Sequence, residues 1–259
     1  MAGSFYPAAP GELAAAVDKL LSQAAPFRGA RLTGVVAPHA GYMYSGPVAG
    51  NAFAPLRATH AQFERVLLIG PPHYAPVSGI AAPSSAAFAT PLGEVEVDAE
   101  VIATLLDTGL VAIDDRAHAP EHALEVELPF LQITLENFGL IPLLVGDAAP
   151  QTVAAVIDMA MNERTLLVVS TDLSHYLDAA AAEARDHVTA TMIERLAFAR
   201  LGPQDACGYA ALNGALCAAS QKHWRIDRRD LRNSGDTSGD RRRVVGYGAW
   251  TLSEAELTV

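Results

Sequence analysis

Short apolar runs alternate along this chain with longer segments in which apolar residues recur every three or four positions. The short runs are typical of strands buried on both faces, and the recurring pattern is typical of helices packed on a core. The runs predict strands at residues 32–37, 66–70, 139–146 and 166–170. The recurring pattern predicts helices at residues 10–21, 47–56, 98–107, 120–137, 150–161, 179–200 and 204–221. This alternation of strands and helices predicts an α/β fold.

Weaker patterns add the remaining strands. Shorter strands are expected at 79–84 and 92–97. The chain closes with strand patterns at 224–231 and 244–252 on either side of a turn-rich segment, which predicts an antiparallel pair. No linker, repeat or shift in composition divides residues 1–259. We therefore expect one three-layer α/β/α domain, with helices on both faces of a central, mostly parallel sheet.

Three of the predicted strands run into a histidine just beyond their carboxyl ends, namely His39, His73 and His175. In an open α/β sheet, ligands bind beyond the carboxyl ends of the strands. Neutral imidazole is also the commonest metal-binding side chain. The pattern therefore predicts one shared site that holds a metal ion. For each histidine taken by itself, a hydrogen-bonded structural role is the alternative.

Two further sets of residues have the right chemistry for such a site. Asp172 lies three positions before His175 and would orient it or pair with its charge, unless Asp172 merely caps the next helix and His175 is exposed. Cys207 is expected just inside the helix predicted at 204–221. There the backbone N–H groups would lower the pKa of the thiol and favour the metal-binding thiolate. The alternative for Cys207 is a small core residue.

The pair Glu121-His122 does not have the spacing of the HExxH zinc motif. The acidic residue is explained by its place at the positive end of the helix predicted at 120–137. His122 and Tyr42 are candidates for the wall of the pocket. The remaining histidines lie among polar neighbours and are expected at the surface: His60, His118, His187 and His223.

Composition and charge exclude several classes of protein. The chain is 51% hydrophobic and 18% charged, which excludes a disordered chain, and its formal net charge of −11 argues against binding to nucleic acid or an anionic membrane. The arginine-rich stretch 225–243 is interleaved with aspartates, as in a solvated and self-paired surface. The chain also lacks the glycine-rich motifs of nucleotide-binding loops.

The expected compartment is the cytoplasm. The first basic residue is Lys19, so no export signal opens the chain, and no apolar run reaches the roughly 20 residues of a membrane helix. Cys207 and Cys217 are predicted on one helix about 15 Å apart, too far for a disulfide. Reduced thiols are typical of cytoplasmic proteins.

Several longer motifs, taken together and in this order, resemble the Memo family over nearly the whole chain. They are AGSFYP at 2–7, APHAGYMYSG at 37–46, GPPHY at 70–74, EHALEVELPFLQ at 121–132, STDLSHY at 170–176, ACGYAA at 206–211, and NSGDTSGD followed by VVGYGA near the end.

The resemblance implies a fold shared with the class III extradiol dioxygenases, which are non-haem iron enzymes with a metal site at the strand ends. His39 and His73 match the two metal-binding histidines of Memo proteins, and Cys207 matches the cysteine that completes the triad. Asp172 and His175 match residues that line the same pocket. In the dioxygenases the histidine at that place acts as an acid or base.

A thiolate in the triad departs from the dioxygenases, which use a carboxylate suited to iron(II) and oxygen. Sulfur is softer, favours copper(I), zinc or a differently tuned iron, and is itself oxidisable. The resemblance therefore favours a mononuclear iron(II) or copper site, with zinc as a third choice, in a dioxygenase-like oxidoreductase that acts on a small-molecule or peptide substrate.

Other functions stay open at this point. The same residues would serve a non-enzymatic copper- or iron-binding protein, a metal-independent module that binds a peptide or phosphorylated ligand, or a zinc hydrolase. Prokaryotic relatives are often linked with a radical-SAM protein, which implies a partner of that kind. An exposed strand at the C-terminal edge would permit a homodimer.

Overall fold

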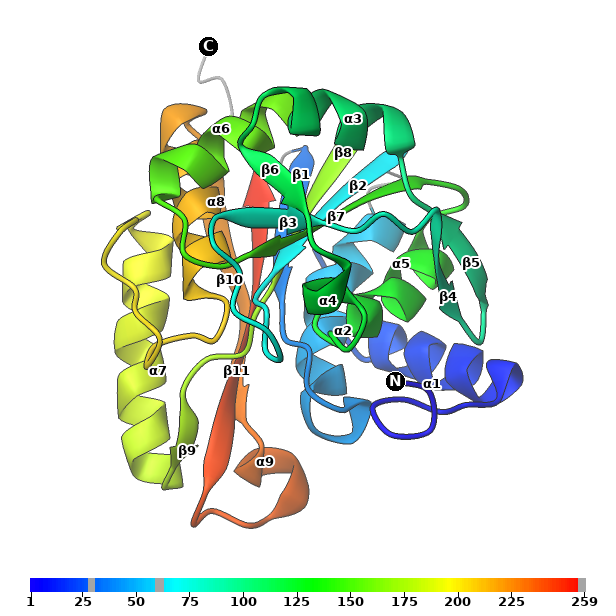
Figure 1. Ribbon diagram of the computed structural model, residues 1–259. Helices are drawn as coiled ribbons and strands as arrows, with labels where there is room; N and C mark the ends of the chain where they lie inside the picture. The colour runs from blue at the N-terminus through cyan, green and yellow to red at the C-terminus, as the bar shows by residue number, and fades with distance from the viewer. Residues whose placement is uncertain (28–30, 59–62, 256–259) are drawn as a thin grey trace.

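The computed structural model describes residues 1–27, 31–58 and 63–255. Within these residues the chain forms a nine-stranded sheet with the order β10-β11-β1-β8-β2-β7-β3-β6, and β9 pairs with β11 beside this path (Figure 1). The centre of the sheet consists of four mutually parallel strands. They are β1 (Leu32–Ala37), β8 (Thr165–Ser170), β2 (Arg65–Gly70) and β7 (Gly139–Val145). The predicted mostly parallel sheet is thus confirmed.

Antiparallel pairing flanks this centre on both sides. On one side β11 (Val244–Ser253) pairs with β1 and β10 (Arg225–Asn233) pairs with β11, as the C-terminal patterns predict. On the other side β3 (Ile80–Ala82), which lies in the strand expected at 79–84, is antiparallel to β7 and parallel to β6 (Val111–Ile113). Neither β6 nor the antiparallel pairing of β3 was predicted from the sequence. The remaining strands are β9 (His175–Leu177), antiparallel to β11, and the separate hairpin of β4 (Ala87–Thr90) and β5 (Gly93–Glu96).

Helices cover both faces of the sheet and complete the three layers (Figure 1). One face packs against α1 (Pro10–Ser22), α2 (Tyr42–Ala58) and α5 (Leu128–Thr134). The other face packs against α3 (Ala99–Asp107), α6 (Pro150–Ala160), α7 (Ala179–Glu194) and α8 (Tyr209–Gln221). Short helices lie in the connections: α4 (Asp115–His118), a 3-10 helix at Glu125–Glu127, and α9 (Gly235–Ser238).

Burial on both faces explains why the central strands read as continuous apolar runs. In β2, Leu67 and Ile69 join the core on the α6–α8 side, whereas Val66 and Leu68 join the core on the α2 side. All four side chains are at most 1% exposed. A strand with two buried faces has no position for a polar side chain, so the alternation of half-buried strands disappears.

We expect Leu67→Ala to lower the free energy of unfolding by about 2–5 kcal/mol, because it removes a fully buried side chain and leaves a cavity at the centre of the sheet. Guanidinium chloride unfolding measures the change. Leu110→Ala is the matched control, since Leu110 is 37% exposed and its truncation should stay within about 0.5 kcal/mol. Equal losses in the two variants would contradict the assigned core.

Several helix boundaries differ from those predicted. The α2 helix begins at Tyr42 rather than at Pro47, because the N–H groups of Tyr44 and Ser45 bond to the carbonyl of Gly41. The predicted helix at 179–200 ends at Glu194, after which Leu196 adopts a positive φ of 51°. Residues 98–107 agree with prediction, and the Asp98 carboxylate caps α3 by accepting the Val101 N–H at 3.0 Å.

The predicted helix at 120–137 is the largest error. Residues 121–124 are irregular, Glu125–Glu127 form a 3-10 turn, and only Leu128–Thr134 are α-helical. Pro129 lies in the first turn of α5, where the missing N–H costs least. The buried apolar residues are divided between the 3-10 helix and α5, so their helical spacing does not come from one continuous helix. No helix among the described residues is long and apolar enough to cross a membrane.

Candidate metal centre

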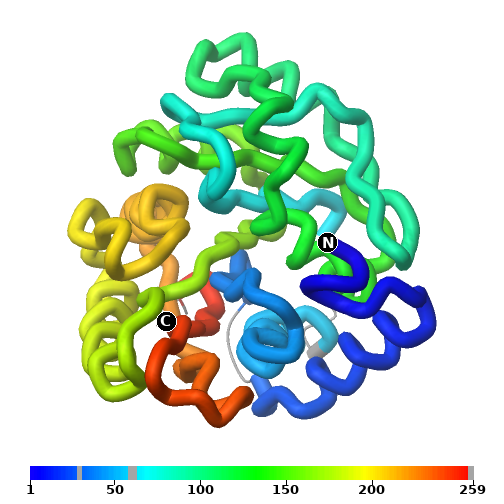
Figure 2. The backbone as a smooth tube through the Cα atoms, turned by 60° about the horizontal axis from the view of Figure 1, so that its bottom comes forward, coloured from blue at the N-terminus to red at the C-terminus, as the bar shows by residue number. Residues whose placement is uncertain are grey.

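The three strands predicted to present histidines are direct neighbours, in the order β1-β8-β2. His39 and His73 follow the carboxyl ends of β1 and β2, and His175 opens β9 after the loop that follows β8. Figure 2 turns this end of the sheet toward the viewer, and the chain after β8 crosses its middle. The Thr171 N–H bonds to the Ala37 carbonyl at 2.8 Å, so the ends of β8 and β1 stay together.

His39, His73 and Cys207 form the group best suited to hold a metal ion. One ligand atom from each lies within 4.8 Å of the others. Cys207 Sγ is 3.4 Å from His39 Nε2, and the rings of His39 and His73 stand nearly perpendicular, with centroids 5.1 Å apart. The side chain of His73 is 26% exposed, whereas His39 is 1% exposed, so the group is open on the His73 side.

His39 is held at its backbone and at its ring. Its N–H donates to Asp172 Oδ1 at 3.0 Å, and its Nδ1 lies 2.8 Å from the Ser170 hydroxyl. Burial first, and then the charges of the neighbouring histidines His73, His122 and His175, lower the pKa of His39 well below its usual value. The ring is therefore neutral at neutral pH, which is the form that binds a metal ion.

His73 is oriented by Glu121, a residue that the sequence pattern assigned only to a helix end. Glu121 Oε1 lies 2.8 Å from His73 Nδ1, and Oε2 accepts the His73 backbone N–H at 2.5 Å. No helix begins there, so the macrodipole explanation is wrong. A carboxylate on the outer nitrogen of a metal-binding histidine fixes its tautomer and leaves Nε2 for the metal.

His73, Glu121 and His122 form a second group whose ligand atoms also lie within 4.8 Å of one another. Here Glu121 is already engaged, because its Oε1 accepts the N–H groups of His122 and Ala123, each at 2.9 Å. A metal ion would have to compete with these bonds. We therefore assign Glu121 to the support of the first group.

The two candidates for the pocket wall differ in their surroundings. His122 stacks on His73 with ring centroids 4.6 Å apart and lies 5.4 Å from the His39 ring, so it lines the site. Its Nδ1 lies 3.3 Å from Glu121 Oε1, although the two atoms do not form a hydrogen bond. Tyr42 instead donates its hydroxyl to the Val126 carbonyl at 2.7 Å and packs on Phe130 in the core.

His175 has the hydrogen bond that a general base requires. Its Nδ1 lies 2.7 Å from the Leu173 carbonyl, which can only accept, so Nδ1 carries the proton and Nε2 is free in the neutral ring. Burial lowers the pKa of His175 from 6.5, and the charge of His73 lowers it further, although the Leu173 carbonyl opposes the shift. His175 is therefore neutral at pH 7.

The three-residue spacing suggested that Asp172 pairs with His175. In the structure the two side chains do not pair. The Asp172 carboxylate accepts the His39 N–H, and α7 is capped instead by Asp178. Burial raises the pKa of Asp172 to about 7, against the lowering effect of the His39 hydrogen bond. The aspartate therefore anchors the loop that carries His39.

Cys207 lies two residues before α8 rather than inside it, so the predicted lowering of its pKa by the helix start is wrong. Its Sγ accepts the Asp172 N–H at 3.2 Å. Burial raises the pKa of the thiol to about 12, and the charge of Asp172 adds to the shift. A bound cation reverses this preference, because a coordinating thiol is deprotonated. Both cysteines are free.

Gly208 lets the Cys207 loop approach β8. A Cβ at this position would lie 2.8 Å from the Ser170 carbonyl oxygen and 2.8 Å from Thr171 Cβ. We expect Gly208→Ala to push Cys207 away from His39 and to lower the free energy of unfolding by about 1–3 kcal/mol. Metal titration and chemical denaturation measure both effects. Gly202→Ala is the control, because its Cβ meets only Asp205 Oδ2 at 3.8 Å, and an equal effect there would contradict the assignment.

The other histidines lie outside this group. His118 is buried, and its Nε2 bonds to the Ala81 carbonyl at 3.0 Å, which corrects the surface position expected from the sequence. His187 and His223 are exposed as predicted. His60 lies outside the described residues.

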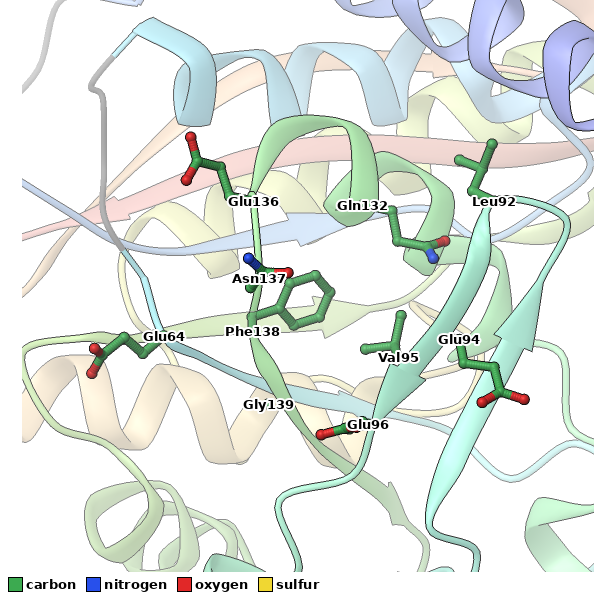
Figure 3. A pocket seen from close by; sticks show the side chains of 10 residues that line it. All are labelled: Glu64, Leu92, Glu94, Val95, Glu96, Gln132, Glu136, Asn137, Phe138 and Gly139. Carbon is green, nitrogen blue, oxygen red and sulfur yellow. The ribbon is translucent and has the colours of Figure 1, made fainter.

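A separate hollow of about 630 Å³ lies beside the β4–β5 hairpin (Figure 3). Glu64 immediately precedes β2 and Gly139 opens β7, so this hollow faces the amino ends of the parallel strands. The histidines follow the carboxyl ends, and the hollow is no part of the candidate metal centre. The glutamates that line it are Glu64, Glu94, Glu96 and Glu136.

Comparison with known proteins agrees with the motif pattern over the full length of the fold. The family model described as "Memo-like protein" matches residues 1–251. A MEMO1 family protein of Methanothermobacter thermautotrophicus is 33% identical, over 95% of this chain and 96% of its own. A MEMO1 family protein of Thermotoga neapolitana is 35% identical, over 94% of this chain and 88% of its own. One of Methanopyrus kandleri is 34% identical over 96% of both chains. The chain therefore belongs to the Memo family.

Proposed function

We propose that this protein binds one transition-metal ion through the imidazoles of His39 and His73 and the thiolate of Cys207. The observation that carries the proposal is the convergence of these three donors within 4.8 Å. Each histidine also has a partner on its outer nitrogen, Ser170 for His39 and Glu121 for His73. Such partners are typical of metal-binding histidines.

The donor set favours iron(II) or copper, with zinc as the third choice. Two imidazoles suit all three metals, and a thiolate raises the preference for soft or redox-active ions. When bound, the ion would supply a Lewis acid and, for iron or copper, an electron-transfer centre. A small-molecule or peptide substrate would approach from the side of His73, which is the exposed member of the group.

The residues around the donors would position the substrate and move protons. The free Nε2 of His175 would accept a proton from the substrate, because the Leu173 carbonyl holds the proton on Nδ1. Asp172 would keep His39 in place through its backbone N–H. His122 would form one wall of the space above the His73 ring. This arrangement favours a metal-dependent oxidoreductase.

A non-enzymatic metal-binding protein is the second candidate. The thiolate favours it, because sulfur retains copper(I) and zinc strongly and is itself oxidisable during oxygen chemistry. In that case His175 would be dispensable, whereas an oxidoreductase requires it.

The test of metal binding is elemental analysis and X-ray absorption on protein purified anaerobically and loaded with iron(II), copper(I) or zinc. We expect one ion per chain, with one sulfur and two imidazole ligands in its first coordination shell. His187→Ala is the control histidine variant, because His187 is exposed on α7. Failure to retain any of the three ions, or an ion bound without sulfur, would overturn the proposal.

A further inference from the structure

We propose that Ser170, completed by a neutral Glu127, sets the tautomer of His39 and so presents its Nε2 toward Cys207. The inference deepens the proposed metal site, and it can be tested on metal-free protein. Ser170 lies at Nδ1 of the His39 ring and contacts Glu127, whereas the Cys207 thiol lies at Nε2 of the same ring. Ser170 is the last residue of β8, and Glu127 is the last residue of the 3-10 helix before α5.

The Ser170 hydroxyl makes three close contacts in a closed environment. Its Oγ is 2.8 Å from His39 Nδ1, 2.7 Å from the Ala123 carbonyl oxygen and 2.9 Å from Glu127 Oε1. Ser170 and Glu127 are 0% exposed and His39 is 1% exposed. With so little exposure, these groups satisfy one another rather than bulk water.

Counting protons gives one arrangement in which all three contacts are hydrogen bonds. A serine hydroxyl donates one proton and accepts two. The Ala123 carbonyl can only accept, so it takes the Ser170 proton. Ser170 must then accept from His39 Nδ1–H and from a protonated carboxyl group of Glu127. If Glu127 were ionised, its Oε1 and Ser170 Oγ would face each other as two acceptors, because the single hydroxyl proton of Ser170 is donated to Ala123.

The surroundings of Glu127 agree with a neutral acid. Its Oε2 has no hydrogen-bond partner among the described residues, and an ionised carboxylate with an unpartnered buried oxygen is very costly. Burial raises the pKa of Glu127 well above its usual value; the Ser170 hydrogen bond opposes that shift, and the charge of Asp172 adds to it.

The consequence for His39 is a fixed proton position. With its proton on Nδ1, the neutral ring has its lone pair on Nε2, the atom 3.4 Å from Cys207 Sγ. The Asp172 carboxylate fixes the backbone of the same residue. Ser170 and Glu127 are thus positioning residues that act through His39 and would not touch a metal ion or substrate.

The direct test is the ring-nitrogen NMR spectrum of His39 in metal-free protein labelled with ¹⁵N-histidine. We expect the parent protein to show a single tautomer with the proton on Nδ1. Ser170→Ala removes the acceptor, and the spectrum should then show both tautomers or the Nε2–H form. An unchanged Nδ1–H tautomer in Ser170→Ala would overturn the proposal, whatever the protein's affinity for metal.

Glu127→Gln tests the neutral acid, because an amide can donate to Ser170 as a protonated carboxyl does. We expect this variant to keep the His39 tautomer and to bind zinc within threefold of the parent, whereas Ser170→Ala should lose about 10–100-fold in zinc affinity. An infrared difference spectrum of the parent against Glu127→Gln should show the band of a protonated carboxyl group. A carboxylate band, or a large change in affinity in Glu127→Gln, would overturn this part.

Thr33→Val serves as the control for loss of a buried hydroxyl, since Thr33 Oγ1 has no hydrogen-bond partner among the described residues. It should leave both the tautomer and zinc affinity unchanged. If the parent retains none of iron(II), copper(I) and zinc, the proposed function fails while the tautomer result still decides the present inference. The two failures are therefore distinguishable.

Discussion

Replacing Cys207 with serine is expected to weaken binding of iron(II), copper(I) or zinc by more than about 100-fold. Loss of a residue that merely supports a metal-binding histidine typically costs about 10–100-fold, so loss of a direct ligand should exceed that range. A serine hydroxyl is a harder donor than a thiol and is far more difficult to deprotonate. Competition with a chelator of known affinity, performed anaerobically, measures the change.

Cys217→Ala is the matched control, because Cys217 is the second free thiol and lies buried in α8. It should keep the full metal affinity of the parent. The sulfur signal in X-ray absorption should disappear in Cys207→Ser and persist in Cys217→Ala. Equal affinity in Cys207→Ser and the parent would show that the thiolate is not a ligand.

Replacing His175 with alanine should separate catalysis from metal binding. We expect metal affinity to change by less than threefold, because His175 belongs to no donor group that the structure identifies among the described residues. Turnover should fall by about 10²–10⁴-fold, the usual contribution of a general acid or base. Dioxygen consumption by iron-loaded protein, with a catechol as the probe substrate, measures turnover.

The protonation state of His175 gives an independent check. An NMR titration of the metal-free parent should place its pKa below 6.5, as burial and the charge of His73 require. The neutral base is then lost as the pH falls through that value, and turnover should fall with it. His187→Ala is the control, and unchanged turnover in His175→Ala would favour the non-enzymatic candidate.

The sequence predicted those parts of the fold that depend on local pattern. The strands β1, β2 and β8 are buried on both faces, so their apolar runs stand out without any knowledge of their neighbours. The strand expected at 79–84 contains β3, but β6 has only three residues, too few to show a period, and was missed. The antiparallel pairing of β3 with β7 depends on a partner about 60 residues away, so no local pattern could predict it. The segment at 120–137 has helical spacing, yet its buried residues belong to two short helices, the 3-10 helix at Glu125–Glu127 and α5.

The same distinction separates the site residues that were predicted from those that were missed. His39 and His73 follow recognisable strand ends. Glu121 supports His73 from 48 positions away, and Glu127 reaches Ser170 across 43 positions, so no local spacing connects them. The pKa of Cys207 follows from burial, which a helix-start argument does not include. The glutamate between Val126 and Leu128, within the otherwise apolar stretch VELPFL, was the available signal for Glu127.

The sequence distance between the proposed ligands affects how the protein would acquire its metal during synthesis. Cys207 and His39 are 168 residues apart, although their ligand atoms are 3.4 Å apart in the fold. A chain emerging from the ribosome exposes both histidines long before the thiol, at rates of about 5–20 residues per second. The complete donor set therefore exists only after α7 and the loop before α8 have been made and packed against β8 and β11. Metal loading would follow folding, and the bound ion would then stabilise only chains that had finished folding.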